Sequence, residues 1–87
     1  MSEEKLKAYV GDYELMPNFV IAITLEEGTL KGQPTGQTKS DLLAEDENKF
    51  YVESADAEVS FVKDASGKVT ALKLIQRGNT REAKKIK

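Results

Sequence analysis

The sequence predicts an all-β fold in which about eight short antiparallel strands run up and down in chain order and close into a small barrel. Residues 19–25 place Phe19, Ile21, Ile23 and Leu25 on one face, which is the two-residue repeat of a half-buried strand. Turn signals built from Gly, Pro, Asn and Asp recur about every ten residues. No crossover helix fits between them, so consecutive strands are expected to pair, and closure removes exposed edges.

A single helix is expected over residues 2–9, "SEEKLKAY", before the first strand. Ser2 can cap its start, and two glutamates follow in the first turn, where the helix dipole favours negative charge. Gly11 ends the pattern. We expect this helix to plug or flank one open end of the barrel through Leu6 and Tyr9.

Eight segments fit strands because each is rich in apolar alternation and is bounded by a turn signal. The turns read "PN", "EEGT", "PTGQT", "DEN", "DASGK" and "RGN" in chain order, and "DASGK" is typical of a tight hairpin. The expected strands are 11–16, 19–27, 29–35, 39–46, 49–54, 57–63, 68–77 and 80–86.

The chain has the length of one small domain, residues 1–87, with one modest core. An eight-stranded barrel either is filled by side chains or holds a small ligand, and strands this short favour filling. We therefore expect a packed interior made of large apolar residues: Phe19, Ile21, Ile23, Leu25, Leu30, Leu42, Phe50, Val52, Val59, Phe61, Val69, Leu72 and Leu74.

Composition excludes most familiar catalytic machinery. The chain has no Cys and no His, so it has neither a disulfide framework nor the commonest zinc ligands and general base. We expect no enzyme activity from this chain alone, no cofactor and no metal. No run approaches the roughly 20 apolar residues of a membrane span, and the start of the chain has no export signal, so we expect a soluble chain.

Residues 32–40, "GQPTGQTKS", superficially resemble a phosphate-binding loop. Gln33 and Thr38 stand where that motif requires its two glycines, and the following residues fit a strand better than a helix, so nucleotide binding is not expected. Gly32 is expected to relieve crowding within a strand or to permit a bulge. The acidic residues at 41 and 45–47 lack the order of an EF-hand loop and indicate a solvated face.

Charge is unevenly distributed along a chain whose formal net charge is −2. Residues 41–58 carry seven acidic side chains against one lysine, a net of −6, whereas residues 68–87 carry seven basic side chains against one glutamate, a net of +6. The two segments either complement one another in the fold or leave the basic one free for an acidic partner. Nucleic acid is not expected, because a basic face with stacking aromatic residues is missing.

Two motifs occur together in a known family. They are the N-terminal Tyr9-x-Gly11-x-Tyr13 and the later run Phe61, Asp64, Gly67, Lys68, Val69, Thr70, Leu72, Leu74, Gln76 and Gly78. Over nearly its whole length the chain resembles the small lipocalin-like domain of unknown function that follows the catalytic domain in many bacterial serine beta-lactamase-like hydrolases and penicillin-binding-protein-related peptidases. The resemblance implies a lipocalin-like barrel that acts as a non-catalytic accessory domain, in the periplasm or outside the cell.

An accessory domain needs a contact surface, and the expected partner is the serine hydrolase catalytic domain or another subunit. We expect this surface on the solvent face of the last two strands, at Lys73, Arg77, Arg81, Lys84 and Lys85. The same residues have a simpler interpretation, since charged side chains keep strand edges soluble.

The alternative function is a barrel that binds a small hydrophobic molecule such as a lipid, a peptide or a cell-wall fragment. Tyr9 and Tyr13 are expected to cap one end of the barrel, with their hydroxyls at the rim. Any cavity should open at that end, where Tyr9, Tyr13, Asn18 and Gln76 would orient the ligand and its apolar part would enter among Phe19, Phe50 and Phe61.

Overall fold

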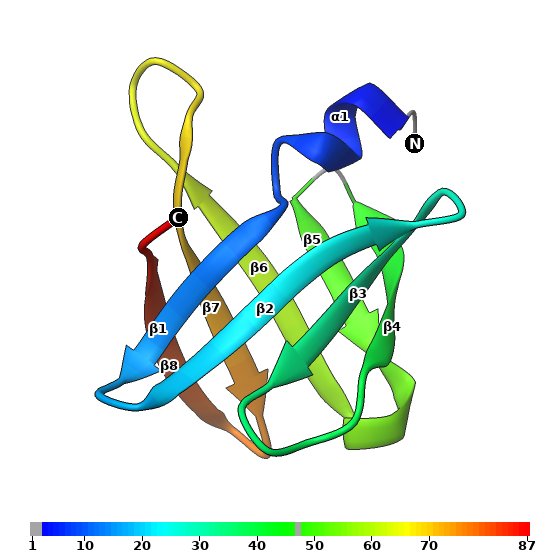
Figure 1. Cartoon of the computed structure of the whole chain (residues 1–87), viewed down its shortest axis with the longest axis vertical. Coiled ribbons are helices and arrows are strands. Elements are labelled where there is room, and N and C mark those ends of the chain that lie inside the picture. The colour runs from blue at the N-terminus through cyan, green and yellow to red at the C-terminus, as the bar shows by residue number, and fades with distance from the viewer. Residues whose placement is uncertain (1–2, 47) are drawn as a thin grey trace.

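A computed structural model of the chain, which describes residues 3–46 and 48–87, is a closed antiparallel β-barrel (Figure 1). Each strand pairs with the next one in the sequence, and β8 pairs back with β1. The elements in chain order are α1 Glu3–Lys7, β1 Gly11–Met16, β2 Phe19–Glu26, β3 Thr29–Pro34, β4 Ser40–Asp46, β5 Lys49–Val52, the 3-10 turn η1 Glu53–Ala55, β6 Ala57–Lys63, β7 Val69–Gln76 and β8 Asn79–Lys85.

The predicted all-β up-and-down barrel with a short N-terminal helix is therefore confirmed, and most strand ends agree within one residue. The last predicted strand starts at Asn79 and not at residue 80. The fifth strand differs more: it ends at Val52, because Glu53–Ala55 turn as η1 and the Asp56 N–H donates to the Glu53 carbonyl at 3.3 Å.

The helix is shorter than predicted. It covers Glu3–Lys7, whereas the sequence pattern suggested residues 2–9, and the expected cap Ser2 lies outside the described residues. After Lys7 the chain tightens, because the Tyr9 N–H donates to the carbonyl of Leu6 at 3.0 Å, only three residues back. This tighter turn accompanies burial of Tyr9 in the barrel, where 1% of it is exposed.

The hairpin predicted for "DASGK" is present between β6 and β7, and Asp64 organises it. One carboxylate oxygen of Asp64 accepts hydrogen bonds from the hydroxyl and N–H of Ser66, at 2.7 and 2.9 Å, and from the N–H of Lys68 at 3.0 Å. These donors, chiefly the Ser66 hydroxyl, lower the pKa of the Asp64 carboxyl. Gly67 supplies the positive φ of 85° that the turn requires.

The seam between β1 and β8 closes the barrel and is short. Only Tyr13 with Lys85 and Glu14 with Lys84 are in register there, while seven pairs join β6 to β7. The seam extends beyond these pairs, because the backbone carbonyl of Asp12 accepts a hydrogen bond from the N–H of Ile86 at 2.8 Å. The closure of the barrel thus depends on a few contacts near the two ends of the described chain.

Candidate functional site

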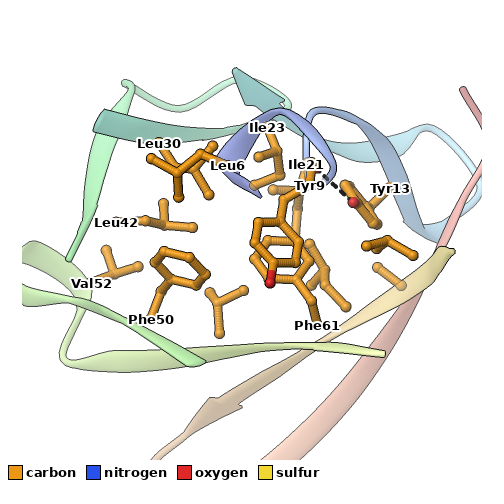
Figure 2. Packing of buried hydrophobic residues seen from close by; sticks show 14 of the residues in the cluster. Leu6, Tyr9, Tyr13, Ile21, Ile23, Leu30, Leu42, Phe50, Val52 and Phe61 are labelled. Atoms are coloured by element: carbon orange, nitrogen blue, oxygen red, sulfur yellow. Dashed lines mark hydrogen bonds between the residues drawn. The ribbon is translucent and has the colours of Figure 1, made fainter. Parts of the chain in front are cut away.

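The two ends of the barrel differ, and the end that carries α1 is filled. Leu6 from α1 and Tyr9 just after it point into the barrel (Figure 2). The Tyr9 ring stacks on Phe61 with 4.5 Å between ring centroids and meets the edge of Phe50 at 5.6 Å. Tyr13 packs edge-on against Phe61 at 5.7 Å. We call Tyr9, Tyr13, Phe50 and Phe61 the aromatic cluster; together with Leu6 it closes this end.

The sequence suggested that the Tyr13 hydroxyl lies at the rim of the barrel, but the structure places it inside. Tyr13 is fully buried, and its hydroxyl donates to the backbone carbonyl of Tyr9 at 2.7 Å (Figure 2). The Tyr9 hydroxyl donates to the side-chain oxygen of Asn48 at 2.7 Å. Burial raises the pKa of the Tyr13 phenol well above its ordinary value. Both tyrosines fix the N-terminal plug to the barrel wall.

The opposite end of the barrel opens into a cavity of about 440 Å³. It lies where β1–β2, β3–β4, β5–β6 and β7–β8 turn, as the up-and-down topology requires. Its inner wall is apolar and reaches the middle of the barrel at Ile21, Ile23, Leu42, Val59 and Leu72. Nearer the opening it is lined by half-buried Leu15, Phe19 and Leu74.

Polar side chains surround the opening of this cavity, which we call the mouth: Gln37, Thr38, Ser40, Ser54, Gln76 and Arg81. Hydrogen bonds hold parts of this ring together. The Ser54 hydroxyl donates to the Ser40 hydroxyl oxygen at 3.0 Å, and the Gln76 amide donates to the Ala55 carbonyl at 2.7 Å. The turn η1 is thereby tied to β4 on one side and to β7 on the other. These two hydrogen bonds hold η1 in place at the mouth.

Ten of the thirteen residues predicted to fill the barrel are buried, among them Val52 and Val59 in the cavity wall. Of the large apolar residues predicted to fill the barrel, Phe19, Leu25 and Leu74 are only partly buried. Phe19 and Leu74 face the cavity. Near the mouth, the inward position at the start of β6 is occupied by the small residue Ala57, which leaves apolar space there. No register shift occurs at Gly32; a Cβ there would lie 3.0 Å from Leu42, so crowding explains this glycine better than a bulge.

The structure does not bring the four predicted ligand residues together. Tyr9 and Tyr13 lie at the filled end, and Gln76 lies at the mouth. Asn18 is exposed in the β1–β2 turn, where it adopts a positive φ of 68°. The error has a topological cause: residues before β1 and residues in the β1–β2 turn lie at opposite ends of an up-and-down barrel.

The predicted basic contact face is also divided. Lys73 and Lys84 lie on the outer surface, and Arg77 lies in the β7–β8 turn with a φ of 51°. Arg81 instead lines the cavity. Lys85 is half-buried. Its side chain lies against Gly11, where an added Cβ would come within 2.6 Å of the Lys85 Cε.

The alternation along β8 gives the reason for this division. Ala83 is completely buried, and residues two positions away on a strand share its face, so Arg81 and Lys85 have inward parity. The apolar signal of β8 is a single alanine, which made this face hard to assign. The two-residue alternation along β8 assigns Arg81 to the inner face, but only once Ala83 is known to face inward.

The acidic segment forms ion pairs with lysines from neighbouring strands. Asp41 pairs with Lys31 across β3 and β4, and Glu58 approaches Lys49 at 3.9 Å across β5 and β6. These pairs do not involve the basic segment 68–87. In residues 3–46 and 48–87, no group of three or more Asp, Glu, His or Cys is placed to hold a metal ion. None of the helices in the described part of the chain has the length and hydropathy to cross a membrane.

The chain is thus a small closed eight-stranded barrel with one filled end and one polar-rimmed cavity. A family model described as "Domain of unknown function (DUF3471)" matches residues 1–84, and the chain belongs to this family. A search of curated proteins found no match.

Proposed function

We propose that this chain is a non-catalytic binding barrel whose mouth takes up a small apolar molecule or an apolar group of a partner. The cavity of about 440 Å³ carries the proposal. Its volume falls within the roughly 300–1,000 Å³ range of small-molecule sites, and an apolar wall with a few polar groups at the opening is the usual composition of such sites.

The distribution of the core supports this function. The aromatic cluster and Leu6 fill the end next to α1 and form a packed part of the core there. Transfer of one methylene group from water into an apolar environment contributes about 0.8 kcal/mol of free energy. A ligand that enters the open half would gain this amount for each methylene that it buries. The barrel can therefore keep a cavity without giving up its packed half.

Filling the cavity tests this proposal. Ala57 is buried at the start of β6 and lines the cavity. We expect Ala57→Leu to abolish saturable amide chemical-shift changes produced by the neutral probe 1-decanol at Leu15, Phe19 and Leu74. Because the added carbons fill empty apolar space, the free energy of unfolding should stay the same or rise by about 0.5–1.5 kcal/mol.

Ala65→Leu is the matched control, since Ala65 is exposed in the β6–β7 turn at the other end of the barrel. It should leave the decanol titration unchanged. Absence of saturable shifts in the unmodified protein, or shifts clustered away from the mouth, would contradict the binding function. The same titration with peptidoglycan fragments and short peptides distinguishes the other apolar ligands.

A second candidate function follows from the resemblance to hydrolase-associated domains: the barrel is an accessory module that docks on a serine hydrolase catalytic domain or another subunit and shapes access to its active site. Lys73 and Lys84 favour this role because they expose positive charge on the outer face of neighbouring strands. Charged surfaces of this kind steer association.

This second candidate is tested beside a catalytic domain encoded with the barrel. We expect deletion of the barrel to change hydrolysis or assembly, and Lys73→Glu with Arg77→Glu to slow association at low salt while leaving the fold intact. The corresponding exchange on the acidic side, Asp41→Lys, is the control for a nonspecific charge effect. Unchanged kinetics and assembly in the deletion would exclude the accessory role.

A further inference from the structure

Arg81 is unusual among the residues that line the cavity. Among the lining residues in the described part of the chain it is the only charged one. It pairs across the β7–β8 ladder with Leu74, which also lines the cavity, and it shares the face of buried Ala83. Arg81 is exposed, and its side chain makes no hydrogen bond or ion pair with another described residue. An unpaired guanidinium thus stands at the entrance of an apolar cavity.

Its surroundings leave this charge available to a ligand. The other polar residues of the mouth are neutral hydroxyls and amides. Two acidic residues lie at or next to the turn η1. Asp56 accepts the Tyr51 hydroxyl at 2.8 Å, and Glu53 lines a neighbouring surface groove that shares hydroxyl residues with the mouth but does not include Arg81. On β8 itself, Glu82 has the opposite parity to Arg81 and pairs in register with Lys73. The mouth carries net positive charge.

The cavity volume limits the size of the molecule. Each non-hydrogen atom of an aliphatic chain occupies a volume comparable to the roughly 30 Å³ share of a water molecule in the liquid. About 440 Å³, part of which lies at the opening, therefore accommodates on the order of 10–15 such atoms. Ile23 and Leu72 belong to the apolar wall that such a chain would contact.

Building on the proposed binding function, we propose that the cavity takes a medium-length aliphatic carboxylate and that Arg81 selects its acid group. The aliphatic tail lies against the apolar wall, and the carboxylate stays at the mouth with the guanidinium. The planar fork of an arginine matches the two oxygens of a carboxylate in a bidentate, charge-assisted pair. A single unpaired positive charge suits a monoanion, and the Ser40 hydroxyl, which accepts the Ser54 hydrogen bond, keeps a donor at the mouth.

The test compares three probes that share one tail: decanoate, 1-decanol and decyltrimethylammonium. Affinities are measured by amide chemical-shift titration at low ionic strength, below the critical micelle concentration of each probe. We expect decanoate to bind about tenfold or more tightly than decanol, and the cation to bind least. In Arg81→Gln the advantage of decanoate over decanol should disappear, while the affinity for decanol stays within about twofold. Arg77→Gln, in the neighbouring turn, should preserve the advantage.

The outcomes separate this inference from the function on which it rests. Equal binding of decanoate and decanol by the unmodified protein would overturn the role of Arg81 but leave the apolar site standing. Binding of none of the probes would overturn both. A loss of decanoate and decanol binding by the same factor in Arg81→Gln would show a structural effect and would also contradict charge selection. Loss of the preference in Arg77→Gln would move the selecting charge to the turn.

Discussion

Phe61→Ala is expected to lower the free energy of unfolding by about 3–5 kcal/mol, the largest loss of any substitution considered. Phe61 is 4% exposed and contacts all three other members of the aromatic cluster. Truncation would leave a cavity beneath Tyr9, whose ring stacks on it at 4.5 Å. A domain of this size has a stability of roughly 4–13 kcal/mol, so much of it would be lost. Urea denaturation followed by far-ultraviolet circular dichroism measures the effect.

Phe19→Ala is the matched comparison, because the same side chain is removed from the other end of the barrel. Phe19 is only partly buried and lines the cavity, so its removal enlarges a space that is already open. We expect a loss of at most about 1.5 kcal/mol. Equal losses in the two variants would show that the interior is not divided into a packed half and a hollow half.

Gly11→Ala is expected to destabilise the domain by about 2–3 kcal/mol and to loosen the seam between β1 and β8. Gly11 has a φ of 154°, and a Cβ added there would lie 2.3 Å from the backbone oxygen of Lys87. The nearby Lys85 side chain can move away, but the Lys87 backbone carries a long hydrogen bond from Asp12 at 3.4 Å and would have to shift. Amide hydrogen exchange should accelerate at Tyr13 and Glu14 more than elsewhere.

Gly67→Ala provides the control for backbone strain alone. Gly67 also has a positive φ, 85°, but a Cβ there would meet nothing within 4 Å. We expect it to cost about 1 kcal/mol, with faster exchange limited to the β6–β7 turn. If Gly11→Ala were no more destabilising than Gly67→Ala, the contact at the seam would not contribute to closure.

The stretch between Ala57 and Gln76 shows why the fold could be predicted from the sequence. Alternation placed Val59, Phe61 and Leu72 on the inner face, and the Asp64 hairpin set the register between the strands. These are local signals, since a two-residue repeat and a turn motif are complete within a few residues. The shorter helix was missed because its end depends on Tyr9 entering the barrel, which is a tertiary contact.

The sequence by itself determined the strand order, the turns, the placement of Leu6 and Tyr9 in a plug, and most of the core. Only the tertiary structure decided which end is open, that Gln76 belongs to the mouth whereas Tyr9 and Tyr13 do not, and that Arg81 lines the cavity. The physical reason is that a cavity is the volume left between side chains from many strands. No single segment encodes that volume, and a small inward residue such as Ala57 leaves space only where side chains from the other strands do not fill it.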